Sequence, residues 1–181
     1  MKCLTKWLSA TLAIALLAST ATAADTVASG KIKSINADNK TFVLTDSSAK
    51  EFTFKIGDDL VINRAGKEGK SDLKAGDTVS VCYDPGVFTW TSHYILVHEG
   101  ATAKSTLSHG AFKSYDTEKK QLAFTDSLKK DTMYAIGDSM VRVNMKDSTV
   151  QELKIGERAL IISNTVEGIS TLTSVMVQRA K

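Results

Sequence analysis

The chain has 181 residues, of which 43% are hydrophobic and 24% are charged, and its formal net charge at pH 7 is +3. A balance this close to neutral lacks the basic footprint of proteins that bind nucleic acid, so we expect no nucleic-acid partner. The sequence also contains only two cysteines, Cys3 and Cys82. If a leader that carries Cys3 is removed, Cys82 is the single cysteine that is left. The folded protein then cannot contain an internal disulfide.

Residues 1–23 have the three-part layout of a secretory signal peptide. A short basic segment holds Lys2 and Lys6, an apolar run extends over 7–18, and small residues end in an Ala-x-Ala pattern at Ala23. The apolar run is shorter than the roughly 20 residues that a helix needs to cross a bilayer. We therefore expect cleavage after Ala23, a periplasmic or secreted protein, and no transmembrane segment after cleavage.

The remainder of the chain matches itself without a gap when it is shifted by 80 residues. For example, residues 45–47 (Thr-Asp-Ser) align with residues 125–127 of the same sequence, and other matches fall on turn residues and apolar positions. A period this long exceeds the ~20–50 residues of solenoid repeats and indicates two copies of one domain. We expect a tandem duplication, with the first domain at 24–101 and the second at 102–181.

Each copy is predicted to consist of short β-strands. Residues 51–56 alternate polar and apolar side chains, which is typical of a strand with one buried face. In chain order, the first copy is expected to form strands at 27–35, 41–45, 51–56, 60–63, 78–83 and 93–98. Turn signals separate them, including Gly57-Asp58-Asp59. About six short strands per copy predict an all-β protein made of two tandem small antiparallel β-barrels.

The same alignment predicts local differences between the copies. Residues 148–151 (Ser-Thr-Val-Gln) fit a capping box and predict a short helical turn, whereas residues 64–70 of the first copy are expected to form a mobile loop. Met140 and Met145 align with Leu60 and Ala65, and are therefore expected to fill the core of the second copy.

A motif shared by both copies carries a resemblance to a known family. Gly30 is followed by Ile35-Asn36 and Gly110 by Tyr115-Asp116, and each copy later contains Leu-Lys-x-Gly-(Asp/Glu), at 73–77 and 153–157. This pattern resembles a family of small bacterial exported β-barrel domains of unassigned function, which are similar to the oligonucleotide/oligosaccharide-binding (OB) barrel. The resemblance implies an OB-like fold for each copy and implies no activity.

Residues found in only one copy are the candidates for function, and they cluster in the last two strands of the first copy. Tyr83, Phe88, Trp90 and Tyr94 are expected to be exposed there and to form a binding surface for a protein or an envelope component. The oligomeric state is not predicted by this pattern.

A metal site is the alternative interpretation. If the last two strands form a hairpin around Val87, Cys82 is expected opposite Ser92 or His93, and a thiol beside an imidazole can bind copper or zinc. His98 cannot join this site. It lies five residues after His93 on the same predicted strand, so the two side chains point to opposite faces and their Cα atoms are ~16 Å apart. Two ligands are fewer than a closed zinc site requires.

No motif in the sequence indicates catalysis. The chain has no Gly-x-Ser-x-Gly, no metal-ligand motif and no phosphate-binding loop. We therefore expect a binding or interaction module without enzymatic activity and without a cofactor.

Overall fold

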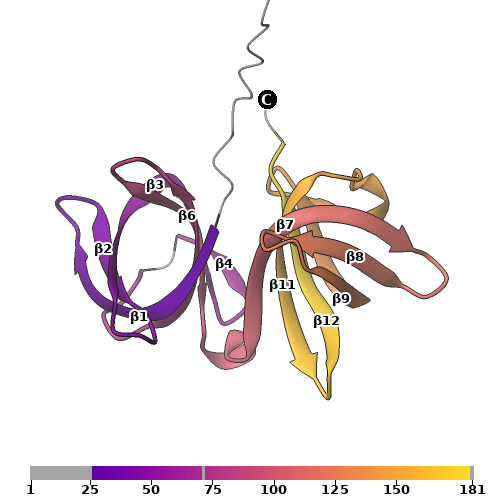
Figure 1. The fold of residues 1–181 in the computed structure, drawn as a ribbon, viewed down its shortest axis with the longest axis horizontal. Helices are drawn as coiled ribbons and strands as arrows, with labels where there is room; N and C mark the ends of the chain where they lie inside the picture. Colours follow the sequence, from indigo (N-terminus) through magenta and orange to yellow (C-terminus); the bar gives the residue numbers. More distant parts are fainter. Residues whose placement is uncertain (1–25, 71, 180–181) are drawn as a thin grey trace, which may run out of the picture.

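The structure is a computed structural model that describes residues 26–70 and 72–179. It is built almost entirely of β-strands, which form two six-stranded sheets (Figure 1). The predicted signal peptide at 1–23 lies outside the described residues. Among the described residues, no helix is long and apolar enough to span a bilayer.

The first sheet closes into a barrel, called here the first barrel. Its strands are β1 (Thr26–Asn36), β2 (Thr41–Thr45), β3 (Glu51–Arg64), β4 (Lys67–Gly69), β5 (Thr78–Pro85) and β6 (Trp90–Val97). Their order in the sheet is β2-β1-β5-β6-β3-β4, and β2 also pairs with β3. That extra pairing joins five strands into a closed ring, which leaves β4 as a short strand at the side.

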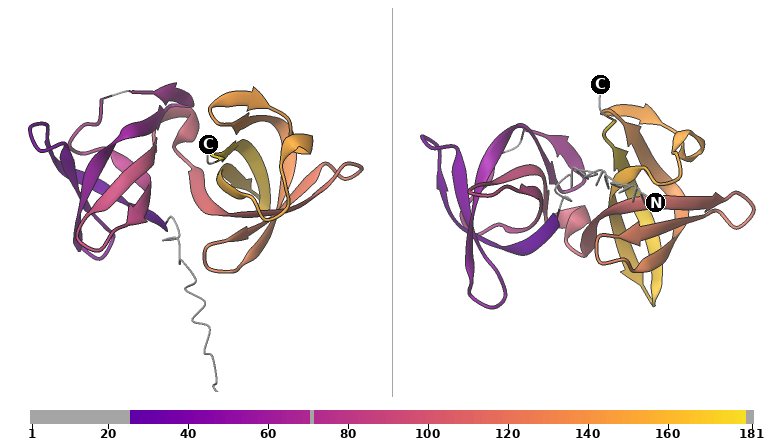
Figure 2. Two further views of the ribbon diagram at one scale, coloured as in Figure 1. Left: turned by 90° about the horizontal axis from the view of Figure 1, so that it is seen from above. Right: turned by 45° about the horizontal axis from the view of Figure 1, so that its top comes forward.

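The second sheet repeats this arrangement and is called the second barrel. A 3₁₀ turn, η1 (Gly100–Thr102), leads to β7 (Ser105–Asp116), β8 (Gln121–Asp126), β9 (Asp131–Val143), β10 (Lys146–Ser148), η2 (Val150–Glu152), β11 (Arg158–Val166) and β12 (Ile169–Val177). The order is β10-β9-β12-β11-β7-β8, and β8–β9 pairing closes the ring. Figure 2 shows the two barrels joined by the short linker. The predicted fold class, all-β with two small barrels, is confirmed.

The pairing directions refine the prediction of antiparallel barrels. In each barrel one pair is parallel, β3 with β6 and β9 with β12, and every other pair between the described strands is antiparallel. A parallel pair needs a long crossover between its two strands. In the first barrel the chain makes that crossover through β4 and β5.

The turn expected at Gly57-Asp58-Asp59 is absent, because β3 continues through it as one strand. The first half of β3 pairs with β2 and the second half with β4, while the register with β6 shifts between Ile56 and Val61. Such a shift bends a strand, and bending lets one strand serve two sides of a closed barrel. Gly57 fits the bend, since a Cβ there would lie 2.6 Å from the carbonyl oxygen of Ser92.

The strand pairings also correct the gap-free alignment. Val61 pairs with Tyr94 in the first barrel, and Met140, not Val141, pairs with Ser174 at the same place in the second. The shift between the two copies is therefore 79 residues in this region instead of 80. Met140 and Met145 consequently fall outside the core and are 42% and 54% exposed.

The two local differences between the copies are smaller than expected. Residues 67–69 form β4, which follows a tight turn at Ala65 and Gly66, both with positive φ. β10 occupies the same place in the second barrel, after a similar turn at Asn144 and Met145. The predicted helical turn is present as η2, but no side chain caps its first residues.

Each barrel encloses its own apolar core. Fully buried side chains in the first include Phe42, Leu44 and Phe54, and those in the second include Leu122 and Phe124. A third buried cluster draws on both barrels. Its members are Cys82, Tyr94 and Leu96 from the first, and Leu107, Ile162 and Met176 from the second. The two barrels therefore pack against each other through the outer faces of their sheets.

Candidate binding groove on the first barrel

One end of the first barrel holds a cluster of aromatic rings. Trp90 stacks with Phe52 at a centroid distance of 5.3 Å and with Tyr83 at 5.2 Å, and Phe54 lies 5.7 Å from it. The described part of the second barrel contains one aromatic pair, Phe124 with Tyr134 at 6.3 Å. The cluster is thus a feature of the first barrel.

Local strand geometry brings these rings together. Phe52 and Phe54 are two residues apart on β3 and so point to the same face. A bulge in β6, where His93 is the extra residue, lets Tyr83 pair with Ser92 and brings Trp90 to the face of Tyr83. Tyr83 itself points inward by the regular alternation of β5, like Val79 and Val81. Trp90 begins β6 and pairs with Phe54 on the parallel neighbour.

Beside this cluster the surface has a shallow, open groove of about 230 Å³. Its lining residues are Lys50, Glu51, Phe52, Thr53, Phe88 and Trp90, which define the aromatic groove below. Phe88 and its neighbour Val87 stand at the tip of the β5–β6 hairpin and are 97% and 90% exposed. Large apolar side chains this exposed, beside a groove, are typical of an interaction site.

Of the two charged residues that line the groove, only Glu51 has an ion-pair partner within the part of the chain that the structure describes. Glu51 accepts a hydrogen bond from Lys33 at 2.6 Å. The ammonium of Lys50 instead lies 4.8 Å from the centroid of the Phe52 ring. It forms no ion pair with any residue of 26–70 or 72–179. A positive charge therefore remains at the edge of the apolar surface.

Two of the four predicted binding residues line this groove and two do not. Phe88 and Trp90 are brought together there, although Trp90 also packs on the core. Tyr83 is buried in the core because it lies on the inward face of β5 with Val79 and Val81, and this burial raises the pKa of its phenol. Tyr94 is buried between the barrels, where burial first and then nearby Glu68 raise its pKa far above the usual value. The expected exposure of Tyr83 and Tyr94 was wrong.

The two residues of the alternative metal site are placed differently from the expectation. Cys82 pairs with Tyr94 across the strands, not with Ser92 or His93, because the bulge shifts the register by one residue. Its thiol lies in the cluster between the barrels, whereas His93 is partly exposed and lies 2.8 Å from Asp84. The described residues contain no group of three or more His, Cys, Asp or Glu arranged to hold a metal. Metal binding by Cys82 and His93 stays a prediction.

A polar network crosses the contact between the barrels. Asn63 donates a hydrogen bond to the hydroxyl of Tyr94 at 3.1 Å, and that hydroxyl donates to Glu68 at 2.8 Å. Arg142 of the second barrel completes it with an ion pair to the same carboxylate, whose side chain is only 7% exposed. A cavity of about 70 Å³ adjoins these residues. The network ties β4 and β6 of the first barrel to β9 of the second.

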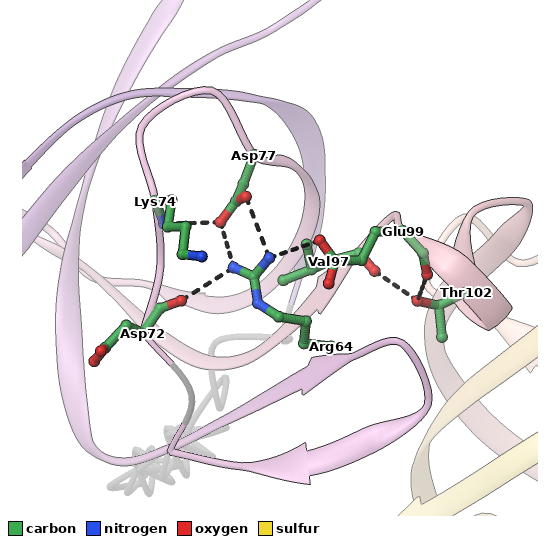
Figure 3. Close-up of polar contacts among 7 residues, drawn as sticks. All are labelled: Arg64, Asp72, Lys74, Asp77, Val97, Glu99 and Thr102. Carbon is green, nitrogen blue, oxygen red and sulfur yellow. Dashed lines mark hydrogen bonds and ion pairs between the residues drawn. The ribbon is translucent and has the colours of Figure 1, made fainter.

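A second network holds the linker onto the first barrel (Figure 3). Arg64 donates hydrogen bonds to Asp77 at 2.5 Å and to Glu99 at 2.8 Å, so one guanidinium spans the loop before β5 and the start of the linker. Thr102 then donates to the carbonyl oxygens of Val97 and Glu99. The start of the linker and its 3₁₀ turn are therefore both held against the end of the first barrel.

The second barrel has a similar arginine–carboxylate network, called here a clamp like the one at Arg64, but its arginine follows β12. Arg179 donates to the carboxylate of Glu157 at 2.5 Å and to the carbonyl oxygen of Glu152. Asp77 and Glu157 occupy matching places, as do the carbonyls of Asp72 and Glu152, but the two arginines do not align. The clamps consequently cannot be found by comparing the two copies residue by residue.

The sequence reasoning missed Lys50 and Phe52 as groove residues. The alternation along residues 51–56 places Phe52 on the buried face with Phe54, and Phe52 is partly buried there. It also borders the groove because it lies near the end of its strand, where the barrel opens. The sequence does contain a sign of this role: the matching residue of the second copy is Thr132, so the ring of Phe52 is found in only one copy.

Comparisons with known proteins give a likeness of fold only. No family model matches the chain, and no curated protein matches it. Among solved structures, a crystal structure of Ag(I)-bound CusF is 15% identical, with a TM-score of 0.32, and the match covers 40% of this chain and 96% of that one. A Cu(II) structure of a CusF variant from Escherichia coli is 15% identical, with a TM-score of 0.33, and covers 45% and 100%. The matched length is about that of one barrel.

Proposed function

We propose that this protein is a non-enzymatic binding module of the bacterial cell envelope, made of two duplicated barrels, that holds an apolar side chain of a polypeptide partner in the aromatic groove. The secretory pattern of residues 1–23 supports its export to the periplasm or the exterior. The repeated sequence motifs and the equal strand order of the two sheets support duplication.

The observation that carries this proposal is the exposure of Phe88 and Val87 beside a groove that already contains partly buried rings. An isolated exposed apolar residue needs no explanation, but a pair beside a hollow lined with aromatic rings forms a continuous apolar surface that a ligand can cover. Three rings pack on Trp90 and hold it in place. A ligand side chain can therefore enter a site that needs little rearrangement, which reduces the entropy lost on binding.

The second barrel serves as an internal control. At the positions that match Phe52, Phe88 and Trp90 it has Thr132, Gly168 and Ser170. The barrel fold can thus be built without these rings. Their presence in the first barrel is explained better by a ligand than by the requirements of the fold.

Fluorescence of Trp90 provides a direct test. Trp7 and Trp90 are the two tryptophans of the chain, so a protein that starts at residue 24 has Trp90 as its single reporter. We expect the peptide Gly-Ser-Gly-Phe, acetylated at its N-terminus and amidated at its C-terminus, to shift the emission of Trp90 to shorter wavelength in a saturable manner. The peptide Gly-Ser-Gly-Ser should leave the emission unchanged.

Matched variants identify the surface that binds. Phe88→Ser should abolish the response to the phenylalanine peptide. Ile169→Ser, on the corresponding hairpin of the second barrel, should leave it intact because this residue is also exposed but does not line the aromatic groove. If both variants respond like the parent protein, the aromatic groove is not the binding site.

A further inference from the structure

Resting on the proposed function, we infer that the aromatic groove recognises the C-terminal residue of a polypeptide, with its apolar side chain in the groove and its free carboxylate on Lys50. This assigns a ligand chemistry to the groove, namely an apolar group and a carboxylate within the same residue. The inference depends on the charge that remains at the groove and on its distance from the rings.

The charge is positive and comes from Lys50. Of the two charged residues that line the groove, Glu51 is already paired with Lys33. Lys50 contacts the face of Phe52, an arrangement that holds an exposed ammonium only weakly. A carboxylate can replace the ring as its partner, because a charged hydrogen bond is the stronger interaction.

The backbone holds Lys50 in a defined position. Its backbone N–H donates to the carboxylate of Asp46 at 2.9 Å, and its carbonyl oxygen accepts a hydrogen bond from the backbone N–H of Asp46 at 2.9 Å. The turn between β2 and β3 is therefore closed by bonds on both sides. Only the side chain of Lys50 has to move when a ligand binds, which limits the entropic cost.

The short distance between the ammonium and the ring selects a terminal carboxylate over an acidic side chain. The ammonium lies 4.8 Å from the centre of a ring that lines the groove. In an extended peptide, neighbouring side chains point to opposite faces and second neighbours are roughly 7 Å apart. An acidic side chain next to the apolar one would thus point away. The α-carboxylate of the last residue is attached to the same Cα as its apolar side chain.

The second barrel shows that the lysine alone does not make this site. Lys130 occupies the position that matches Lys50, but Thr132 replaces the ring of Phe52. The lysine is shared by both barrels, and its combination with the rings occurs in the first barrel. Lys130 is consequently the matched control for Lys50.

The test compares two forms of one peptide on the protein that starts at residue 24. Acetylated Gly-Ser-Gly-Phe with a free carboxylate should bind about fivefold more tightly than its amide at low salt, as judged by Trp90 emission. Lys50→Met should remove this difference, so that the acid and the amide bind equally tightly to the variant. Lys50→Arg should retain part of the difference, and Lys130→Met should retain all of it.

The outcomes separate the two proposals. Equal binding of acid and amide would overturn the carboxylate assignment while the groove stands as a binding site. No response to either peptide would overturn both. Decanoate offers the same carboxylate beside an acyl chain, and saturation by decanoate at lower concentration than the acid peptide would overturn the choice of a polypeptide. Loss of the acid preference in Lys130→Met would show that the second barrel binds the carboxylate instead.

Discussion

Arg142 of the second barrel forms an ion pair with Glu68 of the first, and the Glu68 side chain is only 7% exposed. The same carboxylate accepts a hydrogen bond from Tyr94, so one acidic group joins three strands of two barrels. This contact sits beside the apolar cluster of Leu96, Leu107 and neighbouring residues. The two barrels are therefore held together by both apolar packing and a buried charge.

Replacing Glu68 should weaken the contact between the barrels. Glu68→Gln leaves the partly buried Arg142 guanidinium with only the exposed carboxylate of Asp147 as its counter-charge, and we expect the protein to lose about 2 kcal/mol of unfolding free energy. Urea denaturation would measure this loss. Asp147→Asn is the control, because Asp147 also contacts Arg142 but its side chain is 90% exposed, so its removal should change little. Equal losses in both variants would contradict the role given to Glu68.

Reactivity of the Cys82 thiol should report on the same contact. Cys82 is 1% exposed and lies in the cluster between the barrels. We expect a thiol reagent to modify it slowly in the parent protein and several-fold faster in Glu68→Gln, because modification requires the barrels to separate or to unfold locally. Labelling followed by mass spectrometry gives the rates. Rapid labelling of the parent protein would mean that this face is open in solution.

Two carboxylates predict a loss of stability in acid. Burial opposes the ionisation of Asp77, but hydrogen bonds from Arg64 and from the backbone of Lys74 outweigh it and lower its pKa. The hydrogen bond from Arg179 likewise lowers the pKa of Glu157. Since both pKa values are lower in the folded state, their contribution is complete above the unfolded values near pH 4 and is lost as pH falls below them.

Variants at Asp77 test this prediction. Asp77→Asn should cost about 2 kcal/mol at pH 7, because Arg64 loses a charged partner, and should flatten the dependence of stability on pH between about pH 5 and pH 2. The unfolding free energy measured over that range would show it. Asp58→Asn, at a side chain that is 91% exposed, should keep the slope of the parent protein. An unchanged slope in Asp77→Asn would refute the assignment.

Trp90 and Phe88 should differ in their effect on stability although both line the groove. Trp90 packs on three rings, so Trp90→Ala should cost about 3 kcal/mol. Phe88 is 97% exposed, and Phe88→Ala should change the unfolding free energy by less than about 0.5 kcal/mol. Thermal or urea unfolding distinguishes the two. A large loss in Phe88→Ala would place that ring in the core and remove the basis of the binding proposal.

The sequence by itself determined most of the segments that become strands, and that the chain contains two similar barrels. Alternation along residues 51–56 and turn residues between strands act over a few positions, and the self-similarity of the chain repeats them in the second half. It also singled out Phe88 and Trp90, because the second copy has no ring at those positions.

Only the tertiary structure decided the register of the strands and the faces of their side chains. The bulge at His93 brings Trp90 to the face of Tyr83 and sets Tyr94 opposite Cys82, and the bend in β3 replaces an expected turn. A shift of one residue moves a side chain to the other face, and barrel closure, which depends on contacts far apart in the chain, determines where such shifts occur. The same long-range contacts bring Glu68 to Arg142 and Lys50 to the groove, which local pattern does not encode.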